Sequence, residues 1–379
     1  MNEKSIVLVY AEAMEMGGVA VAFCEFAKEL ERQGYEVKAL IPYKTDLEII
    51  RIPKRYVCGT VWRRRVRNRW VKKFLNAFNV LTRWRVYFWL TPKFDHDIFV
   101  NYLAFWNSHW CFYSKKPKVG FFHNAAPMRH GGFNERVWNY FIKSEYERYD
   151  KLIAVSDFLA DGWMKRYALS RRPEVVHNLV DIDSILIKGD APIDIPTRNG
   201  VKRLLFVGRL VPIKGVDRLM NVARRLKDGG FDFDLNVVGD GPEKSWMETF
   251  VKENGLSGEV RFFGVQENPY PYMKASHLLV CASYSEGWPM TFKESLLMRC
   301  PILTTDFGSA KSRLNDGRWG IVVDNTEDAF YEGVRRFLSG ELNCAPTSGY
   351  DEIEHEMRFD DGSNRDRMIE IFQEVMEKK

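Results

Sequence analysis

The chain of 379 residues lacks the sequence features of several large protein classes. It has no run of about 18 apolar residues that would span a bilayer as a helix. Its start, Met1-Asn2-Glu3-Lys4, does not place a basic segment before an apolar one, so no secretory signal is predicted. No Gly-x-Gly-x-x-Gly pattern opens either half, which disfavours hydride transfer with a dinucleotide. We therefore expect a cytoplasmic protein.

The sequence also lacks the clusters that hold metal ions. Its six cysteines are scattered without a Cys-x-x-Cys pair, which favours reduced thiols with packing roles. Asp-x-Asp pairs, which can bind divalent ions, occur at Asp95 and Asp97, at Asp181 and Asp183, and at Asp232 and Asp234. Each pair lies at a strand edge or in a linker, where solvated acids are common. We therefore assign no metal and expect no cofactor.

Residues 51–94 lack acidic side chains entirely. This segment holds 13 Lys and Arg residues and no Asp or Glu, so the rest of the chain carries a net charge of −8 against +5 for the whole. Aromatic side chains such as Trp62, Trp70 and Trp84 lie between the cations. Aromatic and basic residues together suit the interface of an anionic bilayer, where each cation contributes about 1 kcal/mol.

Three other interpretations of residues 51–94 stay open. The same composition serves nucleic acid through phosphate contacts and base stacking, or an acidic soluble acceptor, or merely a solvated basic loop. Its position inside an otherwise acidic, enzyme-like chain favours a membrane or lipid-diphosphate patch. We therefore predict a peripheral protein on the inner face of the membrane, without a nucleic-acid partner.

Apolar segments alternate with amphipathic ones across residues 202–340. The repeat of strand, loop and helix is about 25 to 30 residues long, which is typical of a parallel doubly wound sheet. The first half follows the same order, with strands expected at residues 5–10, 36–41 and 118–124. Residues 180–200 interrupt the pattern with Pro and Gly and are expected to form a linker. Two α/β domains are the expected architecture.

The segment Ser285–Glu294 combines two carboxylates with a Gly-x-Pro turn. An apolar run at 278–282 predicts a buried strand before it, and Pro289 or Met290 is expected to begin a helix after it. The free N–H groups at such a helix start favour a phosphate. Glu286 and Glu294 lie on either side of that start and suit hydroxyl groups. A solvated loop acid and an ordinary helix acid are the alternative interpretation.

Two cations follow the predicted strand at 203–207. Gly208 ends that strand, and Arg209 and Lys214 lie in the loop before the next helix. Open α/β sheets bind ligands at the carboxyl ends of their strands, which is where this loop is expected. A lone loop cation is more often solvated, but two cations beside a glycine turn favour a bound anion.

These two motifs resemble the donor-binding motifs of family 4 glycosyltransferases of the GT-B fold. The resemblance rests on Glu-Gly-x-Pro with a second Glu eight positions after the first, and on Gly-Arg followed by Lys-Gly. It implies two Rossmann-like doubly wound domains with a donor and acceptor cleft between them. It also implies that Arg209 and Lys214 neutralise the donor diphosphate, that Glu286 contacts the transferred sugar and that Glu294 holds the ribose.

The resemblance implies roles for further residues. His123, at the end of a first-domain strand, corresponds to a histidine beside the donor sugar. The backbone at Gly264 and Val265 meets the nucleobase. The other donor-binding positions that it implies are Gly17, Gly18, Gly208, Gly287, Trp288, Pro289, Met290 and Thr291. The charged residue that commonly follows the glycine loop is missing after Gly18, which leaves the role of this loop open. His177 matches no required histidine and is interpreted as structural.

The expected domains are 1–180 for the acceptor and 200–362 for the nucleotide-sugar donor, with a C-terminal helix at 363–379 that returns to the first domain. The resemblance implies a retaining transferase acting on a nucleotide-diphosphate sugar, with UDP favoured by the habit of the family. Its expected acceptor is membrane-associated, lipid-linked or a glycan, in polysaccharide or glycolipid assembly. An epimerase or phosphorylase of the same fold and a non-catalytic membrane adaptor are the alternatives. The complete set of Arg209, Lys214, Glu286 and Glu294 argues against the adaptor.

Overall fold

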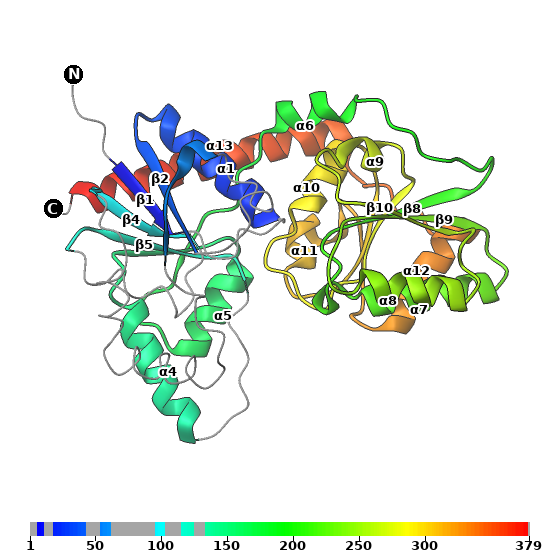
Figure 1. Cartoon of the computed structure of the whole chain (residues 1–379), viewed down its shortest axis with the longest axis horizontal. Helices are drawn as coiled ribbons and strands as arrows, with labels where there is room; N and C mark the ends of the chain where they lie inside the picture. The colour runs from blue at the N-terminus through cyan, green and yellow to red at the C-terminus, as the bar shows by residue number, and fades with distance from the viewer. Residues whose placement is uncertain are drawn as a thin grey trace. The chain divides into compact units, whose positions relative to one another are not determined.

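The computed structural model describes residues 6–10, 18–42, 54–61, 95–102, 115–124 and 133–377. These residues form two compact units, each built on a parallel sheet with helices around it (Figure 1). Unit 1 comprises Met1–Val180 and Asp361–Lys379, and unit 2 comprises Asp181–Asp360. The α/β fold class expected from the sequence is confirmed.

The sheet of unit 1 has seven described strands, all parallel, in the order β3-β2-β1-β4-β5-β6-β7. The strands are β1 (Ile6–Tyr10), β2 (Glu36–Pro42), β3 (Val57–Val61), β4 (Ile98–Asn101), β5 (Lys118–Phe122), β6 (Lys151–Ala154) and β7 (Glu174–Val175). Every residue of β4 and β5 is buried, as expected for strands that helices cover on both faces. The strand order reverses between β1 and β4, which makes this the switch point where ligands bind in such sheets.

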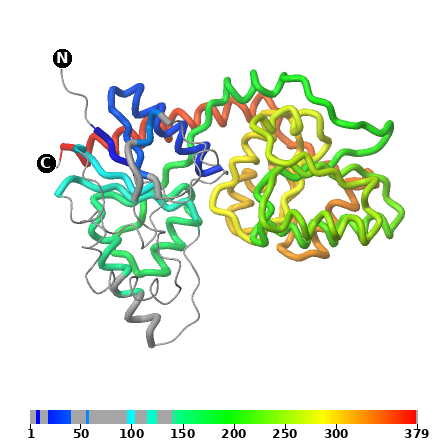
Figure 2. The backbone as a smooth tube through the Cα atoms, in the orientation of Figure 1, coloured from blue at the N-terminus to red at the C-terminus, as the bar shows by residue number. Residues whose placement is uncertain are grey.

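The described helices of unit 1 are α1 (Gly18–Arg32), α4 (Phe133–Tyr146), α5 (Asp157–Tyr167) and the end of α13 (Tyr350–Glu377), with a short 3-10 turn, η1, at Lys54–Tyr56. The apolar residues of the end of α13 that lie in the core of unit 1 are Met368, Ile371, Phe372 and Val375. The red C-terminal segment accordingly runs beside the blue N-terminal segments in Figure 2.

Two hydrogen bonds from backbone N–H groups to side chains of α13 fix the end of the first half of the chain. Asp361 Oδ2 accepts from Val180 N at 3.0 Å, and Asn364 Oδ1 accepts from His177 N at 2.7 Å. The chain passes from unit 1 to unit 2 after Val180 and returns before Asp361. The two passages therefore lie side by side in unit 1. α13 begins at Tyr350, earlier than the stretch 363–379 that the sequence indicated.

The sheet of unit 2 has six described strands, all parallel, in the order β10-β9-β8-β11-β12-β13. The strands are β8 (Lys202–Val207), β9 (Phe233–Val238), β10 (Val260–Gly264), β11 (Leu278–Cys281), β12 (Ile302–Thr305) and β13 (Ile321–Val323). The order reverses between β8 and β11, so the switch point of this sheet lies where these two strands end.

The helices of unit 2 are α6 (Ile182–Gly189), α7 (Val216–Asp228), α8 (Lys244–Glu253), α9 (Tyr270–Lys274), α10 (Met290–Leu297), α11 (Ala310–Arg313), α12 (Glu327–Ser339) and the start of α13, with 3-10 turns η3 (Pro212–Lys214) and η4 (Asn315–Gly317). α6 lies inside the stretch 180–200 that the sequence indicated as a linker. Its N-terminus is capped by Asp181, whose side chain accepts from Ser184 N at 3.1 Å.

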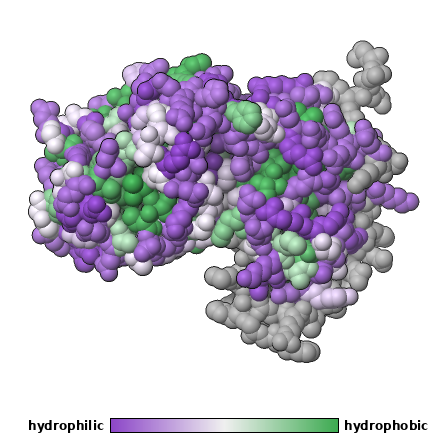
Figure 3. All heavy atoms as spheres, turned by 180° about the vertical axis from the view of Figure 1, so that it is seen from behind, coloured by the Kyte–Doolittle hydropathy of each residue, from purple (hydrophilic) through white to green (hydrophobic). Residues whose placement is uncertain are grey.

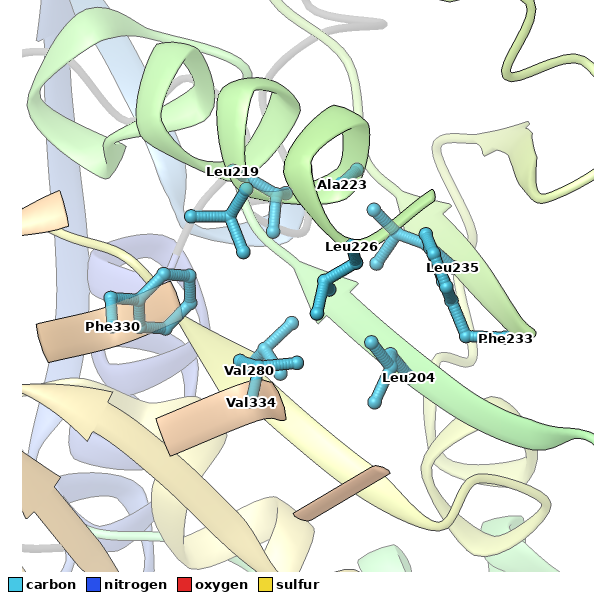
Figure 4. A pocket seen from close by; sticks show the side chains of 10 residues that line it. Leu204, Leu219, Ala223, Leu226, Phe233, Leu235, Val280, Phe330 and Val334 are labelled. Carbon is cyan, nitrogen blue, oxygen red and sulfur yellow. The ribbon is translucent and has the colours of Figure 1, made fainter. Parts of the chain in front are cut away.

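The core of unit 2 is apolar and closely packed. A small cavity in it is lined by side chains of the sheet, α7 and α12, among them Leu204, Leu219, Val280 and Phe330 (Figure 4). Because only apolar residues line this cavity, it is part of the core and offers no polar group to a ligand.

The visible face of the molecule in Figure 3 is mostly hydrophilic, with apolar residues gathered in smaller groups between polar ones. Such scattered apolar groups are ordinary for a protein surface. Within the described ranges, no helix combines the length and the apolar character that crossing a membrane requires.

Candidate active site

The predicted donor-binding residues of unit 2 gather where β8 and β11 end. Gly208 and Arg209 follow β8, and Glu286 lies in the loop after β11. Because the carboxyl ends of neighbouring parallel strands meet at one edge, the structure brings these loops together. The candidate site is therefore the carboxyl edge of this sheet at its switch point.

The loop after β8 presents its two cations in different ways. The Arg209 side chain is exposed and makes no ion pair with any residue that the structure describes. Lys214, at the end of η3, is half-buried and points its Nζ at Glu286 Oε1, 2.5 Å away. The edge thus carries one cation already paired and one available to an anion.

Two glycines let the strand-end loops approach one another. Gly215 has φ +65°, and a Cβ there would lie 2.0 Å from the carbonyl oxygen of Ala282. Gly239 has φ +141°, and a Cβ there would lie 1.9 Å from the carbonyl oxygen of Gly208. Any side chain at either position would separate loops that now touch backbone to backbone. These glycines therefore set the spacing of the edge.

Glu286 is held firmly but keeps one oxygen available. Its Oε1 accepts hydrogen bonds from Lys214 Nζ and from Ser283 Oγ, the latter at 2.8 Å. Its Oε2 receives none from the described residues, and the side chain is 11% exposed. An anchored carboxylate with a free oxygen is suited to accept from a hydroxyl group of a ligand.

Side chains of neighbouring elements fix the loop that carries Glu286. Thr305 Oγ1 donates to the carbonyl oxygen of Ser283 at 2.7 Å, and Ser309 Oγ donates to that of Gly287 at 3.3 Å. The Trp288 ring lies under the Arg313 guanidinium, 3.7 Å from ring centroid to Cζ. The loop is therefore a built feature, anchored from β12 and α11.

α10 begins directly after this loop. Pro289 precedes it in an extended conformation, Met290 and Thr291 form its first turn, and no side chain caps it. The N–H groups at an uncapped helix start, with the positive end of the helix dipole, favour an anion there. The helix start that the sequence indicated at Pro289 or Met290 is present in the structure.

Glu294 lies on the second turn of α10 and is 6% exposed. Its neighbour Lys293 pairs with Asp360 Oδ2 at 3.0 Å, and consecutive helix residues point in different directions. No described residue donates a hydrogen bond to the Glu294 carboxyl group. Burial raises its pKa from 4.5 to about 7. A buried carboxyl group without a partner is a site for hydroxyl donors of a ligand.

The nucleobase position expected from the sequence lies at the end of β10. Gly264 has φ +64°, and its carbonyl oxygen accepts from Gly239 N at 2.7 Å. Val265 follows it and is 37% exposed. These residues border the loop after β9, which in turn touches Gly208.

His123 lies in unit 1, directly after β5. It is 5% exposed, its ring lies 4.5 Å from that of Tyr102, and neither ring nitrogen bonds to any described residue. Burial lowers its pKa from 6.5 to about 3, so the ring is neutral near pH 7. It therefore offers an uncharged donor and acceptor at the carboxyl edge of this sheet.

Several predicted positions lie outside the described residues. They are Gly17 and most of the basic segment 51–94. Gly18 is the first residue of α1 and is exposed. Of the basic segment, the structure describes residues 54–61, which form η1 and β3.

Sequence reasoning missed three residues beside the site, which are Arg218, Tyr284 and Asn325. Arg218 is 4% exposed, and it contacts both Tyr284 in the loop after β11 and Asn325 before α12. The only sequence signal is an arginine within the apolar stripe that begins at Val216.

No group of three or more potential metal ligands occurs among the described residues.

Two protein-family models match most of the chain. Residues 16–184 match the model described as Glycosyltransferase Family 4, and residues 191–351 match that described as Glycosyl transferases group 1. The chain belongs to the family 4 type of glycosyltransferases. The resemblance drawn from its motifs is thereby confirmed, and it places the site described above in the second of the two matched regions.

Among curated relatives of this glycosyltransferase is a Campylobacter jejuni protein, N-acetylgalactosamine-N,N'-diacetylbacillosaminyl-diphospho-undecaprenol 4-alpha-N-acetylgalactosaminyltransferase. The two are 29% identical over 209 residues, which is 54% of this chain and 55% of the relative. A Salmonella typhimurium lipopolysaccharide 1,6-galactosyltransferase is 25% identical over 51% of this chain and 54% of its own. The chain thus spans about half the length of these curated relatives.

A solved structure with a similar fold is sucrose-phosphate synthase of Thermosynechococcus elongatus, with a TM-score of 0.73, 14% identity, and coverage of 99% of this chain and 100% of the other. Anabaena HepE in complex with UDP has a TM-score of 0.68 at 15% identity and covers 98% of this chain and 100% of the other. At such identities the likeness shows the fold alone, which is GT-B.

Proposed function

We propose that this glycosyltransferase moves a sugar from a nucleotide-diphosphate donor, with UDP favoured, to a membrane-associated or glycan acceptor. The observation that carries the proposal is the edge where β8 and β11 end, with exposed Arg209 beside the Lys214–Glu286 pair. Cations for a diphosphate and a carboxylate for a hydroxyl meet there. That combination suits a sugar joined to a diphosphate.

The proposed reaction breaks the bond between the anomeric carbon and the donor phosphate oxygen. A bond from that carbon to an acceptor hydroxyl oxygen replaces it on the same face, and the hydroxyl proton passes to the departing phosphate. The main demand is stabilisation of the anionic leaving group. Arg209, Lys214 and the uncapped start of α10 supply fixed positive charge and N–H groups for it. No resident metal or cofactor is included in the proposal.

Glu286, Glu294 and His123 are the proposed contacts to donor hydroxyl groups. Glu286 Oε2 would accept from the sugar while Oε1 stays bonded to Lys214 and Ser283. Glu294 would accept from the ribose, which supplies the partner that its buried carboxyl group lacks. Neutral His123 would contact the sugar from unit 1. Gly264 and Val265 would meet the base.

The proposed setting is the assembly of a cell-surface polysaccharide or glycolipid at the inner face of the membrane. The Campylobacter relative is named for a diphospho-undecaprenol acceptor and the Salmonella relative for lipopolysaccharide. Both names support a lipid-linked or glycan acceptor here. The cations and aromatic residues of segment 51–94 support attachment to an anionic membrane surface.

A same-fold epimerase or phosphorylase would use the same diphosphate contacts. Donor turnover without any acceptor would favour the epimerase, and dependence on inorganic phosphate would favour the phosphorylase. The alternative of a non-catalytic adaptor predicts no donor binding at all. The complete Arg209, Lys214, Glu286 and Glu294 set supports a catalyst over an adaptor.

The proposal is tested by ligand-observed binding of UDP-, GDP- and ADP-sugars to the purified protein, followed by assays with the sugar that binds. We expect one base to bind clearly, and expect Arg209→Ala and Lys214→Ala to lower transfer by at least about 100-fold. Arg224→Ala is the matched control, because Arg224 is also an exposed arginine of unit 2 but lies on α7. Equal transfer rates in all three variants would contradict the site.

A further inference from the structure

Arg218 is a buried cation on α7 that contacts the loop of the candidate site at Tyr284. It lies on the first turn of α7, is 4% exposed, and has no Asp or Glu oxygen within ion-pair distance among the described residues. A buried guanidinium without a carboxylate is costly unless other groups satisfy its charge. Its actual partners are therefore informative.

The Arg218 guanidinium joins three segments that follow different strands. Its Nη1 donates to the carbonyl oxygen of Ala282 at 3.1 Å and to Asn325 Oδ1 at 2.8 Å. Its Nη2 reaches the backbone oxygen of Asn325 at 3.4 Å. Its Cζ lies 4.3 Å from the ring centroid of Tyr284. α7 follows β8, Tyr284 follows β11 and Asn325 follows β13, so one side chain connects three strand ends.

The same three segments also bond to each other around Arg218. Tyr284 Oη donates to Asp217 Oδ2 at 2.7 Å, and Tyr284 N donates to the carbonyl oxygen of Ile213 at 2.9 Å. Asn325 Nδ2 donates to the carbonyl oxygen of Tyr284 at 3.1 Å. Tyr284 is therefore fixed from both neighbouring segments, on its backbone and on its ring.

The network also fixes the two residues of the ion pair at the site, Lys214 and Glu286. Ile213, whose carbonyl oxygen holds Tyr284, directly precedes Lys214. Tyr284 lies between Ser283 and Glu286 in the loop after β11. Movement of Tyr284 away from Ile213 would therefore lengthen the Lys214–Glu286 contact, which is 2.5 Å.

We propose that Arg218 is a positioning residue of the donor site, which ties the segments after β8, β11 and β13 together and thereby holds Lys214 opposite Glu286. Its charge also adds to the positive potential of this edge, because no described carboxylate neutralises it. The inference rests on the proposed function for the identity of the ligand. The connection itself is independent of any ligand.

The chain contains a matched control on the same helix. Arg225 also lies on α7, also stacks over a tyrosine, with Cζ 4.1 Å from the Tyr331 centroid, and also reaches toward α12. It pairs with the carboxylates of Glu327 and Asp328 at the start of α12, and not with Ala282, Tyr284 or Asn325. Arg225→Met therefore removes a comparable stacked cation away from the site.

The test compares the wild-type chain with Arg218→Met, Arg218→Lys and Arg225→Met. Amide hydrogen exchange of residues 283–287 is measured without ligand, and UDP affinity is measured by titration calorimetry. For Arg218→Met we expect exchange in this loop to rise about tenfold and UDP affinity to fall about tenfold. Arg218→Lys should lie between, because it keeps the charge and loses the planar fork. Arg225→Met should match the wild type in both.

Two milder variants cover the case in which Arg218→Met does not fold. Tyr284→Phe removes only the hydrogen bond from Oη to Asp217. Asn325→Ala removes the side-chain hydrogen bonds to Arg218 and to the carbonyl oxygen of Tyr284. Each variant should raise amide exchange of residues 283–287 about threefold. Loop exchange and UDP affinity in the Arg218 variants equal to those of Arg225→Met would overturn the inference. Absence of nucleotide binding to the wild type would instead overturn the proposed function, while the exchange comparison would still decide the positioning role.

Discussion

At the scale of single residues, the candidate site is distinguished by charges that its own fold does not fully satisfy. Glu294 is buried without a hydrogen-bond donor, and Arg209 is exposed without an anion among the described residues. Selection for stability alone would remove a group such as Glu294, because burying a carboxyl group without a hydrogen-bond partner costs free energy. The presence of Glu294 and Arg209 together at one sheet edge is the signature of a site that a ligand completes.

The buried carboxyl group of Glu294 should make the stability of the protein depend on pH, even without a ligand. Its pKa is about 7 in the folded protein against 4.5 for a free carboxyl group. The folded state thus holds a proton that the unfolded state has lost, and stability falls as pH rises from 4.5 to 7. Glu294→Gln removes this loss, so the variant should gain up to about 3 kcal/mol over the wild type between pH 5 and pH 8.

Urea unfolding of both proteins at pH 5 and pH 8 measures this gain. Glu253→Gln is the control, since Glu253 is an exposed carboxylate of the same unit. The control should follow the wild type at both pH values. A constant difference between Glu294→Gln and the wild type at the two pH values would count against an unpaired buried carboxyl group at position 294.

The sequence predicted the residues that carry charge better than those that position them. Glu286, Arg209 and Lys214 follow strands whose apolar runs are easily recognised, so their place at the sheet edge follows from the period of the chain. The contact between Lys214 and Glu286 joins residues 72 positions apart and depends on how two loops pack. Arg218 was missed for the same reason, because its partners follow other strands.

At the scale of elements, strand-end loops are held together by backbone contact and by short side chains. The turn between η3 and α7 rests on the end of β11 through Gly215, and the loop after β9 rests on the end of β8 through Gly239. Sequence patterns place a glycine at such turns, but they do not tell which neighbouring backbone it meets. That information comes from the strand order, which reverses between β8 and β11.

The close contact at Gly215 can be separated from simple backbone strain. Gly215 and Gly255 both have φ +65°, but a Cβ at Gly215 would lie 2.0 Å from the Ala282 carbonyl oxygen, whereas at Gly255 the nearest atom is Lys227 Nζ at 4.0 Å. Gly255→Ala should cost about 1–2 kcal/mol, the usual penalty of the left-handed region. Gly215→Ala should cost about 1–3 kcal/mol more, because the loop must move away from β11.

Thermal unfolding and UDP titration of the two glycine variants measure these effects. Only Gly215→Ala should weaken UDP binding, since only that turn adjoins Lys214 and the loop of Glu286. Equal losses of stability in both variants would mean that the contact with Ala282 is readily relieved. Unchanged UDP binding in Gly215→Ala would mean that the spacing of the two loops does not matter to the site.

At the scale of the whole molecule, each unit has its own sheet and core, and α13 has residues in both units. Its first residues belong to unit 2, and its later apolar residues Met368, Ile371, Phe372 and Val375 complete the core of unit 1. The helical spacing of those apolar residues indicated a helix, and the family resemblance implied that it packs on the first half. The sequence did not indicate that the helix begins as early as Tyr350, because residues 350–362 are mostly polar.

The strongest charge asymmetry of the whole chain is the basic segment 51–94. The segment carries 13 cations, whereas the rest of the chain has a net charge of −8. The segment should therefore bind an anionic surface that repels the rest of the chain. Replacing Arg63, Arg64, Arg65 and Arg67 with Ser should lower pelleting with phosphatidylserine vesicles by at least about tenfold at low salt, at about 1 kcal/mol per cation. Neutral vesicles should pellet neither protein.

A matched variant removes the same charge elsewhere. Lys188, Arg224, Lys252 and Lys274 are exposed cations of unit 2, so their replacement with Ser changes the net charge equally. This variant should pellet like the wild type, and raising the salt should release both in parallel, because screening weakens every surface contact of this kind. If the two variants pelleted equally, binding would follow net charge, and the segment would be a solvated basic loop without a membrane-facing role.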